Sequence, residues 1–317
     1  MRLKVLHHDR CFDGAASAAL FARFYRDVVD PAASIEYRGL MHAPGGTFDE
    51  GVLDGDVNAI VDFRYCSSPK LHWWFDHHAS AFPSPEDEAH FRADRAGQKH
   101  FDPKCSSNTK LLVTVAASRF GWDFSPWTEL VEKAHMIDGA FFESAAHAVA
   151  LAEPALQIMA VLEGNDDGRI VGRIVRMMTE RTLAEIASDP EVAVPFATIR
   201  ARHEKTRTRI EEVATLDAGV VTFDLSTDGF EAFNKFIPYS LFPQARYSVA
   251  VTATRSRCKV SVGSNPWPPI PRTHDISEIC RRYGGGGHAA VGAISFPTGE
   301  IEKARAAAKE IVEELKR

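Results

Sequence analysis

The sequence predicts an α/β protein, in which a largely parallel N-terminal sheet with helices on both faces precedes a smaller C-terminal α+β domain. Short apolar strand patterns alternate with helical patterns over the first half of the chain, as right-handed crossovers between parallel strands require. Strand patterns then dominate the second half. The length of 317 residues is also about twice the roughly 150 residues of an average domain.

The composition restricts the class of protein. Apolar residues make up 45% of the chain and charged residues 25%, which excludes disordered and fibrous classes. No apolar run approaches the ~20 residues of a membrane span, and the first residues form no signal peptide. The net charge of −6 disfavours a general clamp on long nucleic acid but allows short strands. Five scattered cysteines without a C-x-x-C pair favour a reducing cytoplasm, so we expect a cytoplasmic protein with no membrane association.

Polar residues follow the strands expected in the N-terminal half. These strands cover residues 3–6, 35–38, 57–61 and 71–75. The first leads into a polar run, residues 7–14, and a helix follows at once. The third stops at Asp62 and the fourth at Asp76-His77-His78. Because ligands bind at the carboxyl ends of strands in an open parallel sheet, these endings predict a functional site.

The middle of the chain contains a long polar stretch, residues 80–104, without a clear period. A loop of this length inside a compact domain is usually functional or disordered. Helical patterns follow at residues 108–120 and 127–136 and continue to about residue 190. We take the charged helical segment 191–216 as a connector between a first domain, 1–190, and a second, 217–317.

The second domain combines strands with a glycine run. Strands are expected at 219–223, 247–254, 259–262 and 293–296, and helices at 276–283 and from about residue 300. Glycines 284–287 precede His288, and four residues without Cβ atoms let the backbone present N–H groups to an anion. The run lacks the endings of a P-loop or a dinucleotide fingerprint, so a flexible turn stays an open alternative. His288 and Arg255 favour phosphate binding.

Carboxylate and imidazole residues at the strand ends and helix starts form the strongest chemical pattern. Any one of them alone would more often be a helix cap, but their combination indicates a site for Mn²⁺, Mg²⁺ or a similar ion. Two such ions, which in two-metal sites lie about 3.5–4 Å apart, can together bind a phosphoryl oxygen. The residues are His7, Asp9, Asp13, Asp62, Asp76, His77, His78 and Asp138.

These residues resemble the motifs of the DHH phosphoesterases, which include RecJ nucleases, oligoribonucleases, exopolyphosphatases and family II pyrophosphatases. The triplet that names the family is present as Asp76-His77-His78. The other motifs follow in the family's order: His7, Cys11 and Asp13-Gly14, then Asp62, then Asp138, then Arg255-Ser256 and residues 284–288 of the DHH-associated domain.

The resemblance implies a DHH catalytic domain over 1–190 and a substrate-binding DHH-associated domain over 217–317, with two Mn²⁺ ions, or Mg²⁺ in their place. It implies that one ion is held by His7, Asp62 and either Asp9 or Cys11. Most members carry Asp where this chain has Cys11, and we favour Asp9 as the replacement. The other predicted roles are Asp13, Asp62, His77 and Asp138 on the second ion, Asp76 orienting His77, His78 in catalysis, and Arg255, Gly285, Gly286, Gly287 and His288 on substrate.

The resemblance implies a metal-dependent phosphodiesterase that hydrolyses short oligonucleotides or small nucleotide phosphodiesters. The nucleophile would be a hydroxide activated by two metal ions, and cleavage at strand ends would make the protein an exonuclease. A phosphoanhydride hydrolase and a non-catalytic nucleotide-binding protein are the alternatives. Trp267 and Tyr283 favour nucleotides mildly, because polyphosphate offers no base to stack, whereas burial in the core is the more common role of such residues. The sequence decides neither the exact substrate nor its end polarity, nor whether the chain acts as a homodimer.

Overall fold

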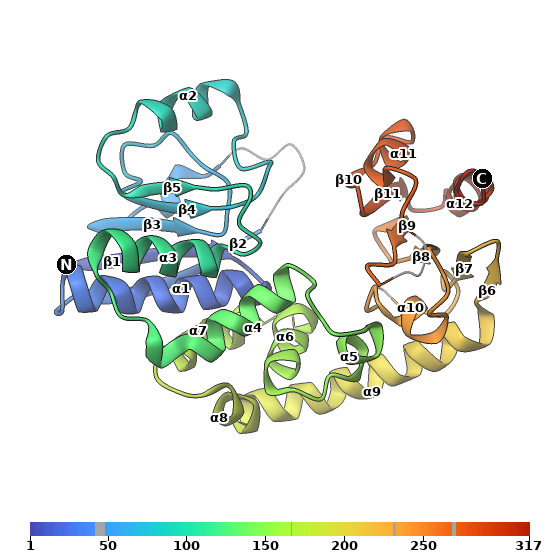
Figure 1. Ribbon diagram of the computed structural model, residues 1–317, viewed down its shortest axis with the longest axis horizontal. Coiled ribbons are helices and arrows are strands. Elements are labelled where there is room, and N and C mark those ends of the chain that lie inside the picture. The colour runs from blue at the N-terminus through green and yellow to red at the C-terminus, as the bar shows by residue number, and fades with distance from the viewer. Residues whose placement is uncertain (42–47, 166, 231–232, 268–270) are drawn as a thin grey trace. The chain divides into compact units, whose positions relative to one another are not determined.

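A computed structural model describes residues 1–317 except 42–47, 166, 231–232 and 268–270 (Figure 1). The chain divides into two compact units, the first formed by Met1–Phe141 with Ala152–Ile199 and the second by Phe142–Leu151 with Arg200–Arg317. Helix α9 (Pro190–Val213) covers most of the predicted connector and runs through Pro195. The functional division into 1–190, 191–216 and 217–317 stays a prediction.

The first unit contains a five-stranded parallel sheet, as the sequence predicted. Its order is β2-β1-β3-β4-β5, and every neighbouring pair is parallel. The carboxyl ends of all five strands therefore meet at one edge. The strands are β1 (Arg2–His8), β2 (Ser34–Leu40), β3 (Val57–Val61), β4 (Trp73–Asp76) and β5 (Lys99–Phe101).

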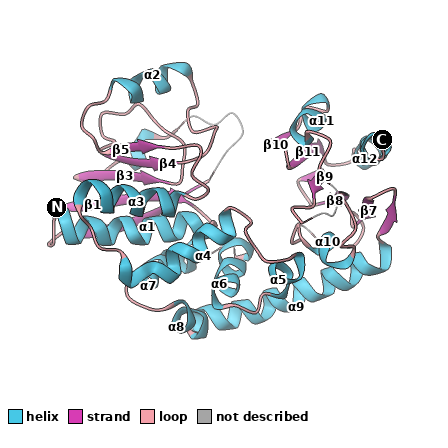
Figure 2. Cartoon of the chain, in the orientation of Figure 1, coloured by secondary structure: helices cyan, strands magenta, loops and turns pink. Residues whose placement is uncertain are grey.

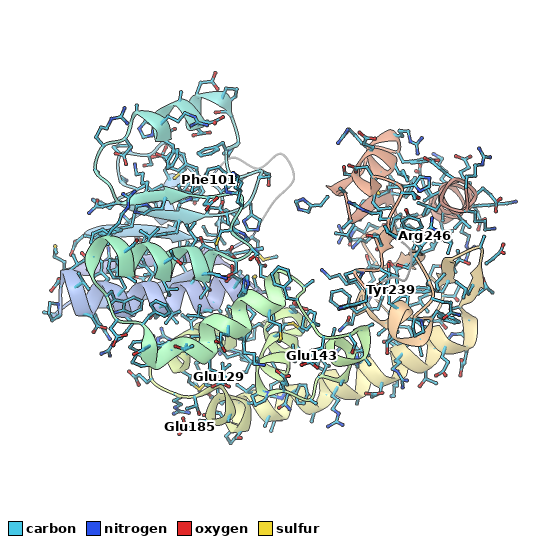
Figure 3. All side chains as sticks on the ribbon, viewed as in Figure 1. Phe101, Glu129, Glu143, Glu185, Tyr239 and Arg246 are labelled. Carbon is cyan, nitrogen blue, oxygen red and sulfur yellow. The ribbon has the colours of Figure 1, made fainter. Side chains whose placement is uncertain are left out.

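Aromatic side chains fill both faces of this sheet, because successive residues of a strand point to opposite sides. Trp73 packs on Phe21 of α1 (Phe12–Phe24) with ring centroids 5.7 Å apart. Trp74 packs on Phe91 of α2 (Pro85–Ala93) at 5.2 Å, and Phe101, which Figure 3 labels, stacks on Trp74 at 5.9 Å. Helices therefore cover both faces, as predicted.

The first unit contains a helix and a strand inside the stretch for which the sequence showed no clear period. Helix α2 and strand β5 lie within residues 80–104, so this stretch is not a continuous loop (Figure 2). The remaining helices are α1 (Phe12–Phe24), α3 (Asn108–Phe120), α4 (Thr128–Asp138), α6 (Pro154–Gly164), α7 (Gly168–Met178) and α8 (Leu183–Ser188), with α2 at Pro85–Ala93. Short helical turns occupy Tyr25–Val29, Glu50–Val52 and Ser125–Trp127.

The second unit is built on a mixed sheet of order β10-β11-β9-β8-β7-β6, which confirms a smaller α+β region. Strands β7 and β8 pair in parallel, and the other neighbours pair antiparallel. The strands are β6 (Thr215–Asp217), β7 (Val220–Asp224), β8 (Tyr247–Ala253), β9 (Arg257–Ser264), β10 (Gly286–His288) and β11 (Val291–Pro297). The helices are α5 (Ala145–Ala150), α10 (Ile237–Leu241), α11 (Ile276–Arg282) and α12 (Ile301–Leu315). Across the described ranges of both units, no helix has the length and apolar character of a membrane span.

Candidate metal centre

The candidate site lies at the carboxyl edge of the parallel sheet. Strands β1, β3 and β4 are neighbours, and the residues at their ends are His8, Asp62 and Asp76. The register pairs His7 with Val61 and Val61 with Phe75, so the residues that follow reach the same edge. Asp13 comes from the first turn of α1 and Asp138 from the last residue of α4.

Asp62 is the centre of the cluster. Its Oδ2 lies 3.5 Å from Nδ1 of His8 and its Oδ1 lies 3.5 Å from Nε2 of His77. The residue is 1% exposed, and within the described part of the chain neither carboxylate oxygen has a hydrogen-bond partner. Its backbone has φ = +57°, a conformation that Asp and Asn adopt more readily than most residues. A buried carboxylate without hydrogen bonds is costly unless a cation compensates it.

His77 presents one ring nitrogen to the three carboxylates. Its Nδ1 donates a hydrogen bond to the carbonyl oxygen of Cys105 at 2.9 Å, which fixes the ring. Its Nε2 then lies 3.3 Å from Oδ2 of Asp138, 3.5 Å from Asp62 and 3.9 Å from Asp13. Burial opposes protonation, but Asp62 and the other carboxylates raise the pKa of His77 to about 10. A histidine held by a carbonyl through one nitrogen is the usual arrangement of a metal ligand.

The carboxylates crowd one another. Asp13 accepts hydrogen bonds from the backbone N–H groups of Asn108 and Thr109 at 2.6 and 3.0 Å, where α3 begins. Burial and the charges of Asp62 and Asp138 raise the pKa of Asp13 well above its ordinary value. Burial and Asp62 raise the pKa of Asp138 to about 6. Like charges at such proximity disfavour ionisation, and a bound cation would relieve this repulsion.

Three overlapping groups have the composition of a metal site. In each group the candidate ligand atoms lie within 4.8 Å of one another, and Asp62 and His77 each belong to two groups. Carboxylate and imidazole ligands fit Mn²⁺ or Mg²⁺, so the donor set and the Asp62 oxygens, which accept no hydrogen bond from the described residues, both suit divalent ions. The groups are His8-Cys11-Asp62, Asp62-His77-His78 and Asp13-His77-Asp138.

Two of the predicted ligands, His7 and Asp9, have no atom in these groups as far as the described residues show. The His7 ring is buried, its Nδ1 lies 3.0 Å from the carbonyl oxygen of His8, and burial lowers its pKa. Asp9 accepts from the backbone N–H of Arg10 at 3.0 Å, and its carboxyl group lies against Gly39 of β2. Side chains alternate along a strand, so His8 faces Asp62 and His7 does not. The resemblance had implied His7 as the ligand.

Cys11, and not Asp9, lies with His8 and Asp62. Burial and the nearby Asp62 and Asp13 raise the pKa of the Cys11 thiol well above its ordinary value. A neutral thiol is a poor ligand for a hard ion, because the thiolate is the form that binds metals. Sequence reasoning missed His8, because two consecutive histidines at a strand end leave open which of them faces the site.

Asp76 holds His78 and does not orient the His77 ring as expected. Its Oδ1 accepts from Nδ1 of His78 at 2.7 Å and from the backbone N–H groups of His77 and His78 at 2.8 and 3.2 Å. Burial opposes protonation of His78, but Asp76 and Asp62 raise its pKa. The His78 imidazole is therefore favoured in its charged form beside the cluster.

The predicted substrate residues of the second unit do not all lie together. The register pairs His288 with Val291, whereas Pro297 pairs with Arg257, two residues beyond Arg255. Val291 and Pro297 are six residues apart on β11, which corresponds to about 20 Å. Arg255 therefore lies at the opposite end of the strands from the glycine run.

Packing of β10 on β11 accounts for two of the glycines. A Cβ atom at Gly285 would overlap the carbonyl oxygen of Ala293, and one at Gly287 would overlap that of Val291. A Cβ atom at Gly286 would meet no atom within 4 Å of the described structure. Packing within the sheet therefore does not explain why a glycine occupies position 286.

Neither aromatic residue that favoured nucleotides is a ready stacking surface. Nε1 of Trp267 donates to the carbonyl oxygen of Phe142 at 2.8 Å, and its ring packs on Phe236 with centroids 5.3 Å apart. The Tyr283 hydroxyl donates to Oε2 of Glu310 at 2.8 Å, and the partly buried residue packs against the hydrophobic core of the second unit. Both contacts suit a structural role.

Comparison with solved structures shows that the chain has a DHH-family fold, as its motifs predicted. It is similar to the pGpG-specific phosphodiesterase PggH from Vibrio cholerae, with a TM-score of 0.69, 19% identity and 99% of each chain covered. The exopolyphosphatase-related protein from Bacteroides fragilis matches with a TM-score of 0.57 and 14% identity over 100% of this chain and 94% of that one. RecJ from Thermus thermophilus in complex with Mn²⁺ matches with a TM-score of 0.56 and 14% identity over 99% of this chain and 52% of RecJ. No protein-family profile and no curated protein sequence matches the chain.

Proposed function

We propose that the chain is a divalent-metal-dependent phosphodiesterase that hydrolyses short oligonucleotides or small nucleotide phosphodiesters. The observation that carries the proposal is the Asp62 carboxylate, which is buried, lacks a hydrogen-bond partner among the described residues and belongs to two of the three ligand groups. The fold supports it, because structures of this fold include a pGpG-specific phosphodiesterase and a RecJ bound to Mn²⁺.

We propose that Asp13, Asp62, His77 and Asp138 hold one ion and that His8, Cys11 and Asp62 face the other, with His7 and Asp9 as the alternatives. Divalent ions at such a site neutralise charge on the phosphoryl oxygens and lower the pKa of water. Mn²⁺ is the proposed ion and Mg²⁺ the alternative, since RecJ structures hold one or the other.

His78 is the proposed general acid. Its Nδ1 is committed to Asp76 at 2.7 Å, so Nε2 is the nitrogen that can donate a proton to the departing oxygen of a phosphodiester. Burial opposes protonation of His78, but Asp76 and Asp62 raise its pKa, which favours the protonated imidazole that a general acid requires.

Residues 217–317 form the proposed substrate-binding domain, residues 191–216 the proposed connector, and residues 1–190 the proposed catalytic domain. Gly286, Gly287 and His288 are exposed and form the proposed phosphate contact, whereas Arg255 lies too far along the sheet to join them. All five cysteines are free thiols, which supports the proposed cytoplasmic location.

A turnover screen with Mn²⁺ tests this proposal against a phosphoanhydride hydrolase. Dinucleotides and cyclic dinucleotides should be hydrolysed faster than polyphosphate or a nucleotide-phosphosulfate compound. The opposite order would favour the anhydride reaction, for which the exopolyphosphatase-related fold neighbour is a precedent. Absence of turnover on every compound, with substrate still bound, would favour the non-catalytic alternative.

The variant Asp62→Asn tests whether turnover depends on this cluster. Asn has nearly the same shape and tolerates the positive φ, so the fold should persist. We expect activity to fall by more than about 100-fold and bound Mn²⁺ to decrease, since changing a residue that only supports a metal ligand already costs up to about that factor. Asp217→Asn, at an exposed residue paired with Lys316, is the matched control. Unchanged turnover and metal content in Asp62→Asn would contradict the proposal.

A further inference from the structure

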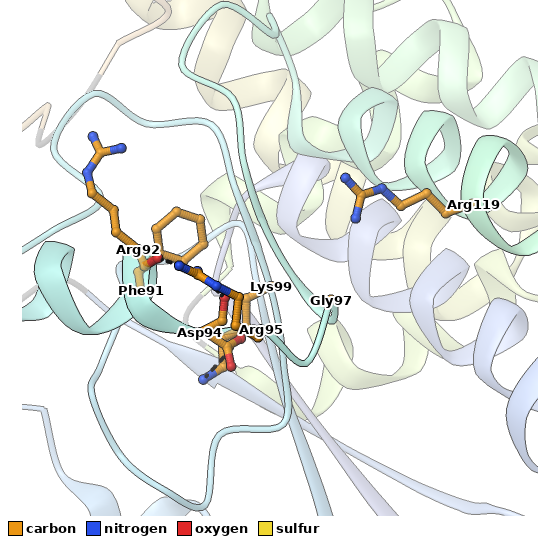
Figure 4. A pocket seen from close by; sticks show the side chains of 7 residues that line it. All are labelled: Phe91, Arg92, Asp94, Arg95, Gly97, Lys99 and Arg119. Carbon is orange, nitrogen blue, oxygen red and sulfur yellow. Dashed lines mark hydrogen bonds and ion pairs between the residues drawn. The ribbon is translucent and has the colours of Figure 1, made fainter.

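A basic pocket lies in the first unit between the end of α2, the loop that follows it, and the end of α3. Its volume is about 460 Å³, within the range of small-molecule sites. Six of its seven lining residues lie in the polar stretch 80–104, and the seventh is Arg119 of α3. Figure 4 shows Arg119 on α3 with its guanidinium turned toward the Gly97 loop, and Arg92, Asp94, Arg95 and Lys99 on the other side.

Positive charge dominates this pocket, although the chain as a whole carries −6. Four cationic side chains line it together with one carboxylate, Asp94. Arg92 also pairs with Glu88. Four cations against these two carboxylates leave an excess of two positive charges.

Two of the cations, Lys99 and Arg95, are held in place by their surroundings. The Lys99 side chain is 8% exposed, and its Nζ lies 3.8 Å from Asp94 and 3.3 Å from the Tyr65 hydroxyl. Nη1 of Arg95 donates to the carbonyl oxygens of Arg92 and Asp94 at 2.7 and 3.0 Å. A positioned guanidinium loses less conformational entropy when it binds an anion than a freely moving one does.

The pocket is separate from the candidate metal centre. Lys99 pairs with Trp74, two residues before Asp76, and therefore lies toward the amino edge of the parallel sheet. Arg119 is eleven residues along α3 from Asn108, the residue whose N–H binds Asp13, which corresponds to about 16 Å. A phosphate in this pocket would not reach the metal ligands.

We propose that this pocket binds an oligophosphate group, a diphosphate or triphosphate that is either free or carried by a nucleotide. Guanidinium groups form paired hydrogen bonds with phosphate oxygens, and an ammonium adds a point charge. Cations on α2, on β5 and on α3 surround one volume, which suits a compact anion with several charges better than a single carboxylate. The site is independent of the proposed phosphodiesterase reaction.

Calorimetric titration of the full chain tests the proposal. The probes are pyrophosphate and ADP in EDTA, which keeps divalent ions out of the metal centre. The pocket variant is Arg95→Gln with Arg119→Gln. The matched control is Arg169→Gln with Arg173→Gln on α7, where the arginines are exposed and pair with Asp167 and Glu191. We expect both probes to bind, with the Kd raised at least about tenfold in the pocket variant and by less than about twofold in the control.

The two probes distinguish the source of the phosphate. Equal affinity for pyrophosphate and ADP supports recognition of the phosphate groups alone, and tighter binding of ADP supports a nucleotide ligand. The proposal is wrong if the wild-type chain binds neither probe, if the pocket variant binds as well as wild type, or if the control loses as much affinity. Melting temperatures of both variants establish that they fold.

Discussion

The Nδ1 atom of His78 donates a hydrogen bond to Oδ1 of Asp76 at 2.7 Å. Asp76 is the last residue of β4 and is fully buried, so the rigid sheet fixes the orientation of the imidazole. The neighbouring His77 is fixed from another direction, by the carbonyl oxygen of Cys105. Two adjacent histidines thus have different supports, which fits different chemical roles.

Replacing Asp76 by Asn should impair His78 without removing metal. We expect kcat to fall by about 10–100-fold and the Mn²⁺ affinity to change little. Because Asp76 raises the pKa of His78, its loss should move the alkaline decline of kcat to lower pH. The kcat of His78→Gln should fall as far, and the double variant should lose little more. Loss of Mn²⁺ from Asp76→Asn would show that Asp76 supports the ligands instead.

The choice between the two N-terminal histidines is testable by metal binding. His8→Gln should weaken Mn²⁺ binding by about 10–100-fold, because Nδ1 of His8 lies 3.5 Å from Asp62. His7→Gln should leave the Mn²⁺ affinity nearly unchanged in the fraction that folds, as judged by its melting curve. Equilibrium dialysis measures both. A larger loss of Mn²⁺ affinity in His7→Gln than in His8→Gln would show that His7 is the ligand, as the family motif implies.

Cys11 and Asp9 allow a similar pair of titrations. Cys11→Asp should tighten Mn²⁺ binding, since a carboxylate replaces a protonated thiol beside Asp62. Asp9→Ala should change it by less than about threefold, because Asp9 faces Gly39 and the Arg10 N–H. Cys11→Ser is the control for side-chain size. A severe loss of Mn²⁺ in Asp9→Ala, with no gain in Cys11→Asp, would restore Asp9 to the site.

Much of the site was predictable, because parallel strands bring their carboxyl ends to one edge whatever their order in the sheet. Asp62 and His77 therefore met as expected. The choice of His8 over His7 was not predictable from two consecutive histidines, since one residue of strand length reverses which side chain faces the site. The separation of Arg255 from His288 depends on the β9–β11 register, for which the sequence carries no local signal.

Helix α2 was missed for a different reason. Most of its residues are polar and none is buried, so hydrophobic periodicity is absent. Its start nevertheless carries a recognisable cap: the Ser84 side chain accepts from the backbone N–H of Asp87 and Pro85 occupies the first turn. The capping residues Ser84 and Pro85 predict the start of this helix, although hydrophobic periodicity does not.

The buried His100 predicts a pH dependence of stability. Burial, assisted by the charge of Arg119, lowers its pKa to about 4, and its Nε2 has no hydrogen-bond partner among the described residues. The unfolded chain therefore binds more protons between its ordinary pKa of about 6.5 and about 4, so stability falls as the pH decreases through this range. In His100→Gln this acid-induced loss of unfolding free energy should be about 2 kcal/mol smaller.

Denaturant unfolding of wild type and His100→Gln at several pH values measures that difference. His288→Gln, at an exposed residue of β10, is the matched control. Its unfolding free energy should change with pH as that of wild type does. If the unfolding free energy of His100→Gln and of wild type changes equally with pH, the folded protein protonates His100 without a loss of stability.

Gly286 separates the structural from the binding role of the glycine run. A methyl group there meets no described atom, so Gly286→Ala should keep the wild-type melting temperature. If phosphate approaches this backbone, the added methyl should raise KM by about tenfold and leave kcat unchanged. Gly168→Ala, on α7 and equally unhindered, is the control. Gly287→Ala should instead lose stability, because its methyl overlaps Val291 and φ is +151°. An unchanged KM in Gly286→Ala would remove this strand from the proposed phosphate contact.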